Sequence, residues 1–151
     1  MIKILCVGKI KEKFYRDAIE EYIKRLKKYT KIEVIECRDF SDIPIDDILL
    51  KEKQELERYI QDRDYVISLD INGVEMDSIS LANKIDSIYL NYSNITFIIG
   101  GSYGIHEELK SRSDFRLSFS KMTFPHQLFR VILLEQIYRS FKINNNESYH
   151  K

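Results

Sequence analysis

Residues 95–104, Ile-Thr-Phe-Ile-Ile-Gly-Gly-Ser-Tyr-Gly, decide the fold class of this chain. A hydrophobic run, four apolar residues and one threonine, that stops at a pair of glycines predicts a strand buried on both faces. The glycines of Gly100–Gly104 allow positive φ and let backbone N–H groups come close to a ligand. The spacing GGxxG matches neither a Walker A loop nor GxGxxG. By itself the segment is therefore explained as a plain strand-to-helix turn.

Strands and helices alternate on both sides of this stretch. Short apolar runs predict four further strands, at Ile2–Val7, Ile32–Ile35, Tyr65–Leu69 and Phe115–Phe119. Helical spacing of apolar residues predicts helices at about residues 11–28, from a cap at Asp46 or Asp47 to about Tyr59, from Asp77 to about Leu90, near His106–Ser111, and from Pro125 as the first helical residue to about Lys142.

This alternation predicts an α/β fold. We expect a single domain over residues 1–151, with a mostly parallel sheet and helices on both of its faces. In such sheets ligands bind beyond the carboxyl ends of the strands. That rule points to three loops, Leu69–Gly73, Gly100–Ile105 and Ser118–Phe124, which hold four of the five glycines. We therefore expect the functional site where these loops meet.

The cysteines and histidines predict neither disulfides nor a metal site. Cys6 and Cys37 each lie in an apolar, strand-like stretch without a CxxC pair, which predicts two buried, reduced thiols. The histidines, His106, His126 and His150, show no ligand spacing with one another or with the cysteines. A chain of 151 residues can bury a core without either kind of cross-link.

The N-terminus and the longest apolar runs indicate where the protein is found. Residues Met1–Gly8 are too short for a signal peptide, and no run reaches the ~20 apolar residues of a membrane span, so we expect a soluble, cytoplasmic protein.

The net charge is zero, but basic residues outnumber acidic ones by ten to four in residues 1–31 and by eight to five in residues 91–151. Such an uneven distribution of charge can present a positively charged face to the phosphates of a nucleic acid. The basic residues at 24–28 fit a solvated helix face equally well.

The loop Ser118–Phe124 and the last three residues carry chemistry of a different kind. The loop offers backbone groups, hydroxyls and apolar surface, which suits an adenine ring and a sulfonium ligand. On residue type alone, core packing is the simpler interpretation of Met122 and Phe124. Residues Tyr149–Lys151 occupy a position that is usually disordered. An aromatic ring, an imidazole and a cation nevertheless suit stacking on a nucleobase and contacting phosphate.

Long segments of the chain resemble a known family. Residues 3–36 (KILCVGKIKEKFYRDAIEEYIKRLKKYTKIEVIE), residues 97–143 (FIIGGSYGIHEELKSRSDFRLSFSKMTFPHQLFRVILLEQIYRSFKI) and the closing YHK are similar to those of the RlmH (formerly YbeA) family. These are bacterial ribosomal RNA large subunit methyltransferases of the knotted SPOUT superfamily. The resemblance covers essentially the whole chain. It departs from the family at Asp39–Lys53 and at Asn144–Ser148, which lacks the Pro or Gly of many relatives.

The resemblance implies a function and the residues that perform it. A trefoil knot would lie near the C-terminus, and a homodimer would transfer a methyl group from S-adenosyl-L-methionine to N3 of a pseudouridine in helix 69 of 23S rRNA, on assembled ribosomes. Substrate binding and catalysis would fall to Arg139, Tyr149 and His150. The cofactor-binding residues would be Leu69, Gly100, Phe119, Ser120, Lys121, Met122, Thr123 and Phe124.

Two other classes of protein stay open. A nucleotide-binding α/β enzyme of Rossmann or flavodoxin type could use Gly100–Gly104 for a phosphate, although the GxGxxG pattern and a following acidic residue are missing. A non-catalytic ribosome-binding factor could share the fold, although the intact loop and tail motifs weigh against it. Binding of S-adenosyl-L-methionine distinguishes the methyltransferase from both.

Overall fold

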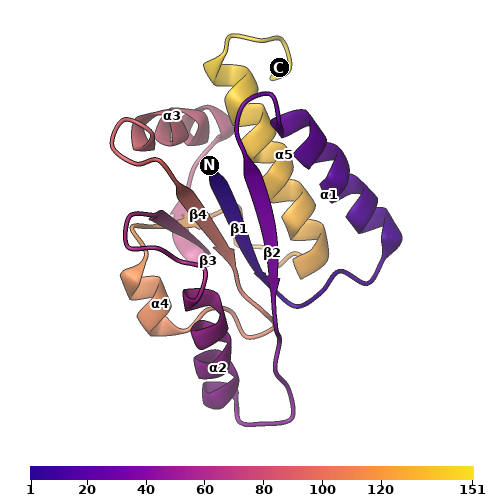
Figure 1. Cartoon of the computed structure of the whole chain (residues 1–151), viewed down its shortest axis with the longest axis vertical. Coiled ribbons are helices and arrows are strands. Elements are labelled where there is room, and N and C mark those ends of the chain that lie inside the picture. The colour runs from indigo at the N-terminus through magenta and orange to yellow at the C-terminus, as the bar shows by residue number, and fades with distance from the viewer.

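Strands and helices alternate along the chain and build one parallel sheet (Figure 1). The structure is a computed structural model that describes residues 1–151. The strands stand in the order β2-β1-β4-β3-β5, and all neighbouring strands are parallel. The elements are β1 (Ile2–Val7), α1 (Lys13–Leu26), β2 (Ile32–Cys37), α2 (Ile45–Glu57), β3 (Tyr65–Glu75), α3 (Ser78–Ile88), β4 (Ile95–Ile99), α4 (Glu107–Arg112), β5 (Phe115–Ser118) and α5 (His126–Asn144).

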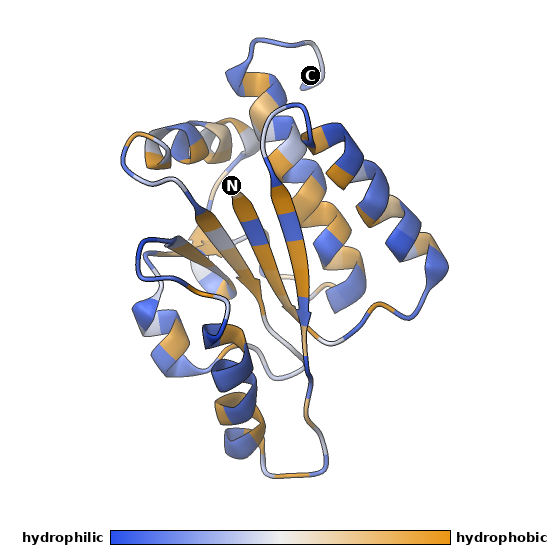
Figure 2. Ribbon diagram, in the orientation of Figure 1, coloured by the Kyte–Doolittle hydropathy of each residue, from blue (hydrophilic) through white to orange (hydrophobic).

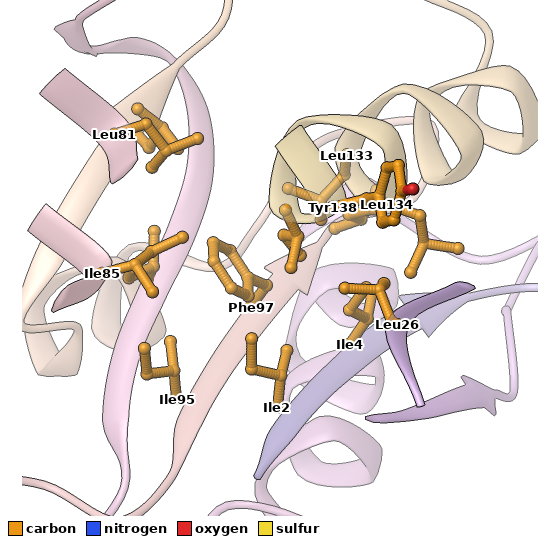
Figure 3. Close-up of a cluster of buried hydrophobic side chains, with 14 of the residues drawn as sticks. Ile2, Ile4, Leu26, Leu81, Ile85, Ile95, Phe97, Leu133, Leu134 and Tyr138 are labelled. Atoms are coloured by element: carbon orange, nitrogen blue, oxygen red, sulfur yellow. The ribbon is translucent and has the colours of Figure 1, made fainter. Parts of the chain in front are cut away.

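Helices cover both faces of the sheet, as the sequence predicts. Neighbouring residues of a strand face opposite ways, so Ile4 of β1 and Phe97 of β4 pack into the larger apolar cluster with α1, α3 and α5 (Figure 3). Leu5 and Ile98 pack into a smaller cluster with α2 and α4. The strands are mainly apolar, whereas the helices carry both apolar and polar residues (Figure 2). Burial of each apolar side chain in these two clusters contributes roughly 1.5–3 kcal/mol to the free energy of unfolding.

Strand β3 continues through the loop that the sequence predicts at Leu69–Gly73. Both Leu69 and Val74 pair with Leu117 of β5, and the residues between them form a bulge. The bulge is tight because a Cβ at Gly73 would lie 2.7 Å from the carbonyl oxygen of Arg116. The apolar pattern predicts the strand but not the bulge, since the close approach of β5 is a long-range contact.

The helix starts are only partly as predicted. Asp77 caps α3 as expected, and its Oδ1 accepts the Ser80 N–H at 2.8 Å. Neither Asp46 nor Asp47 caps α2, because Pro44 occupies that position and the two aspartates lie in the first turn. There their charges still favour the positive end of the helix dipole.

Helix α5 and the residues after it close the fold. Pro125 is the N-cap of α5 and not its first helical residue, which is His126. We call residues 145–151 the tail. The C-terminus lies beside the far end of α5, away from the carboxyl ends of the strands (Figure 1). No helix in the structure has the length and apolar character needed to cross a membrane. The trefoil knot implied by the resemblance stays a prediction.

The two cysteines are buried and free, as the sequence predicts. Burial raises the pKa of the Cys6 thiol to about 12 and the pKa of the Cys37 thiol to about 11. Both thiols are therefore protonated at neutral pH, which makes them poor nucleophiles.

Candidate active site

A pocket of about 380 Å³ lies where the three predicted loops meet at the carboxyl ends of β3, β4 and β5. Its location agrees with the rule for parallel α/β sheets. We call it the loop pocket. It is lined by Leu69–Asn72, Ile99–Ile105, Lys110, Leu117–Ser120, Met122–Phe124, His126 and Phe129.

The first wall is the turn Gly100–Gly104. A Cβ at Gly100 would lie 2.5 Å from the carbonyl oxygen of Gly104, which is closer than real Cβ atoms come. Gly104 has φ +85°, and it forms an isolated β-bridge with Gly101. Glycine is thus required at Gly100 for space and at Gly104 for backbone conformation. At its glycine positions the turn offers only backbone to the pocket, beside the side chains of Ser102 and Tyr103.

The second wall, Ser118–Phe124, is held in place by two serine hydroxyls. The buried Ser118 Oγ lies 3.1 Å from the carbonyl oxygens of Ile71 and Ser120, so it links the wall to the β3 bulge. The Met122 N–H donates to Ser120 Oγ at 3.0 Å. These bonds provide hydrogen-bond partners for polar groups of the turn that would otherwise have none.

The aromatic residues of this wall pack together, while its methionine does not. The rings of Phe119 and Phe124 lie 5.0 and 5.7 Å from that of Phe129. Met122 is 75% exposed, so core packing does not explain it. Lys121 is the one member of the expected cofactor-binding set that does not line the loop pocket. It lines a second hollow instead, together with a smaller set of residues, Ile71–Gly73 and Glu75 of β3.

Two charged residues of the loop pocket were not singled out from the sequence. Asp70 and Lys110 are the only Asp, Glu, Lys or Arg side chains that line it. The turn chemistry of Asp70-Ile-Asn-Gly73 at a strand end could have indicated the carboxylate. Nothing local marks Lys110, because α4 carries it to the pocket from forty residues further along the chain.

The three residues that the resemblance assigns to substrate binding and catalysis, Arg139, Tyr149 and His150, lie close together around a fourth residue, Glu135. Arg139 Nη2 lies 2.5 Å from Glu135 Oε1, and the Tyr149 hydroxyl donates to the same oxygen at 3.0 Å. Arg139 Nη1 lies 3.1 Å from Nδ1 of His150. Burial and the neighbouring Glu135 carboxylate raise the pKa of Tyr149 to about 12, so the phenol stays protonated. The i,i+4 spacing of Glu135 and Arg139 could have predicted this ion pair.

The tail is docked against its own chain by Glu147. The Glu147 carboxylate accepts hydrogen bonds from Lys142 Nζ at 2.9 Å, from the Tyr29 hydroxyl at 2.8 Å and from Lys28 Nζ at 3.3 Å. Its bonds to Lys142 and Tyr29 lower the pKa of Glu147 to about 2. The general expectation of a disordered tail does not hold here.

The tail cluster and the loop pocket are separate sites within one chain. None of Glu135, Arg139, Tyr149 and His150 lines the loop pocket. In Figure 1 the C-terminus lies at the opposite end of α5 from the carboxyl ends of the strands. A single chain thus brings together the residues expected to bind the cofactor, apart from Lys121. It also brings together the residues expected to act in catalysis, but it does not join the two sets.

A wider groove of about 1380 Å³ adjoins the loop pocket and shares Gly101–Tyr103 and His126 with it. Exposed Lys9 and Lys11 line this groove, and the buried Arg130 forms part of it. The groove is large enough for a substrate far bigger than the occupant of the loop pocket. No group of three His, Cys, Asp or Glu side chains is placed to hold a metal ion.

Fold and site together define a class of protein. The model of the family described as "Predicted SPOUT methyltransferase" matches residues 1–150. Among solved structures, "a probable methylase family protein from Haemophilus influenzae Rd KW20" superposes with a TM-score of 0.55. That match covers 99% of this chain and 70% of the other at 11% identity, so it supports the fold alone.

Relatives of known name narrow the class. A protein of Methanococcus maripaludis named "Putative ribosomal RNA large subunit methyltransferase H" is 52% identical over 99% of both chains. "Ribosomal RNA large subunit methyltransferase H" of Clostridium tetani is 48% identical, and that of Clostridium novyi is 47% identical, again over 99% of both chains. The chain belongs to the ribosomal RNA large subunit methyltransferase H family of SPOUT methyltransferases.

Proposed function

We propose that this protein transfers a methyl group from S-adenosyl-L-methionine to N3 of a pseudouridine in helix 69 of 23S rRNA, on assembled ribosomes in the cytoplasm. Family membership supports the reaction class. The observation that carries the proposal is the loop pocket. Its lining of backbone groups, hydroxyls and apolar side chains is the kind of surface that binds a nucleoside with a thioether or sulfonium substituent.

The protein's own task in this reaction is positioning. A sulfonium methyl group is already electrophilic, so the enzyme has to align the attacking nitrogen and exclude water. Leu69, Gly100 and the wall Phe119–Phe124 would hold the donor. The volume of about 380 Å³ lies within the range of small-molecule sites.

The decisive assay is methylation of defined RNA. Assembled ribosomes that lack the modification are incubated with wild-type protein and S-adenosyl-L-methionine, and the helix 69 fragment is analysed by mass spectrometry. We expect one added methyl group on the pseudouridine. Gly100→Arg, which fills the loop pocket, should abolish it. A methyl group elsewhere, or none, would refute the proposal.

We also propose that the protein works as a homodimer in which the tail of one subunit completes the loop pocket of the other. The separation of tail cluster and loop pocket within one chain motivates this arrangement. Gly100→Arg and a variant that lacks Tyr149–Lys151 should each be inactive alone. Mixed together, they should form some dimers with one intact site and regain activity. If mixing restores nothing, the sites are not shared.

His150 is our candidate to accept the N3 proton or to orient the base, with Tyr149 and Arg139 beside it. The pH–rate profile of His150→Gln at saturating donor tests this role. We expect a lower rate and a changed dependence of the rate on pH. If the variant keeps both the rate and the profile of wild type, neither role holds.

Donor binding also separates the two other classes of protein. Neither a phosphate-binding nucleotide enzyme nor a non-catalytic ribosome factor requires S-adenosyl-L-methionine. Titration calorimetry with this donor should show one site per chain.

A further inference from the structure

The loop pocket contains a lysine, Lys110, whose ammonium group makes only long contacts with its carboxylate partners. Lys110 Nζ lies 3.7 Å from Asp70 Oδ2 and 3.4 Å from Glu107 Oε1, and its side chain is only 17% exposed. Charge-assisted hydrogen bonds of this kind usually measure 2.7–2.9 Å. The buried pair of Lys3 and Asp64 in this protein reaches 2.7 Å. Lys110 therefore keeps donor capacity that it can offer to a ligand.

The Asp70 carboxylate opposite Lys110 is likewise shielded from water and makes only a long contact with the lysine. The Asp70 side chain is 5% exposed, and its Oδ1 accepts the N–H of Asn72 at 3.1 Å. This bond fixes the orientation of the carboxylate, while Oδ2 faces Lys110 across a distance too long for a saturated ion pair. The pocket thus holds one positive and one negative group, both largely shielded from water.

We propose that Asp70 and Lys110 bind the amino-acid end of the methyl donor, Lys110 its α-carboxylate and Asp70 its α-ammonium group. This inference rests on the proposed function, which requires S-adenosyl-L-methionine in the loop pocket. An α-amino acid carries its two opposite charges a few ångströms apart, and the pair presents the opposite charges at a matching separation. The remaining lining offers no other charged side chain for them.

The Asp70–Lys110 pair thereby gives the loop pocket a charged part that differs from its backbone and apolar part. Backbone and apolar groups of Gly100–Gly104 and Phe119–Phe124 suit the adenosine, and the charged pair suits the zwitterion. The alternative is that Lys110 and Asp70 merely tie α4 to β3. An ion pair with that purpose would stabilise the pocket equally for every ligand, so the two roles differ in ligand selectivity.

Two thioethers that differ only at the amino-acid end provide the test. S-adenosylhomocysteine carries the zwitterion, whereas 5′-methylthioadenosine lacks it. Lys110→Met should weaken S-adenosylhomocysteine about tenfold or more and leave 5′-methylthioadenosine within about twofold of wild type, as measured by titration calorimetry. Asp70→Asn, which keeps the acceptor for Asn72, should show the same selectivity.

Lys53→Met is the matched control. Lys53 is equally shielded, at 15% exposure, and contacts Glu108 of α4, but it does not line the loop pocket. It should leave both affinities unchanged. Equal losses for both ligands in Lys110→Met, or no loss, overturn the inference while the proposed function stands. Wild-type protein that binds neither ligand would overturn the proposed function and this inference with it.

Discussion

Arg130 shows how a single buried charge can organise the site. The residue is 1% exposed, and its guanidinium donates to the carbonyl oxygens of Val7 and Gly8 at 3.1 and 2.8 Å and to Glu36 at 2.8 Å. Glu36 in turn accepts the N–H of Ile10 at 2.7 Å. These bonds tie α5 to the ends of β1 and β2, at the floor of the groove beside the loop pocket.

Replacing Arg130 by Met should therefore destabilise the protein strongly. The variant leaves two backbone carbonyls and the Glu36 carboxylate without their donor, which costs about 3 kcal/mol of unfolding free energy. Denaturant unfolding measures the loss. Arg25→Met, which removes an exposed arginine paired with Glu21 at 3.3 Å, is the control and should change stability far less, because exposed ion pairs contribute little. Equal effects of the two variants would contradict this account.

At the scale of elements, α5 and the tail form one unit. The Tyr149 ring packs edge-on against Tyr138, 5.0 Å between centroids. Between these two residues, Glu147 bonds to Lys28 and Tyr29 in the turn that follows α1. The proposed sharing of the tail between subunits requires that it adopt a defined shape. This docking pre-organises the tail for such a role.

Docking of the tail should depend on pH in the acid range. The pKa of Glu147 is about 2 in the folded protein and about 4.3 when unfolded. Because the folded pKa is the lower one, the stabilisation is complete above the unfolded value and disappears as pH falls towards 2. The ring signals of Tyr149 in NMR spectra should move towards free-tyrosine positions over this range.

Glu147→Gln should produce the same shift of the Tyr149 signals already at neutral pH. Glu33→Gln, which breaks the surface pair with Lys31, is the control and should leave them in place. Unchanged Tyr149 signals between pH 5 and pH 2 would show that Glu147 does not hold the tail.

At the scale of the whole molecule, charge distribution matters more than net charge. The chain is neutral overall, yet Lys9 and Lys11 lie on the groove that opens into the loop pocket. A strand of RNA that delivers a base to the pocket would have to pass close to them. Contacts between lysines and phosphates release counterions and make binding salt-dependent.

Two phosphate contacts predict about tenfold weaker RNA binding when salt rises about fourfold. Replacing both Lys9 and Lys11 by Ala should flatten this dependence, which fluorescence anisotropy with a helix 69 stem-loop can measure. Lys13→Ala is the control, because Lys13 pairs with Asp17 and lies outside the groove. A salt slope that is the same in the double variant and the control would exclude the groove as the RNA path.

Much of the fold follows from local pattern. The period of apolar residues predicts the bounds of the strands and helices within about two residues, except that β3 ends at Glu75, six residues later than predicted. The three loops expected at the carboxyl ends of the strands do converge. The failures are equally specific. The bulge after Leu69 depends on β5, which is distant in sequence. The caps at Asp46 and Asp47 are unused because Pro44, just before them, is the N-cap of α2. Lys121 lies in the predicted loop but does not line the loop pocket.

Sequence alone determined the α/β class, the buried thiols and the family resemblance, because burial period, turn chemistry and motif are written in consecutive residues. Tertiary structure decided which side chains share a space. Lys110 reaches Asp70, Glu135 gathers the tail, and Arg130 ties α5 to β1 only because the sheet brings remote segments together. Such contacts carry no local periodicity, so they appear only once the chain is packed.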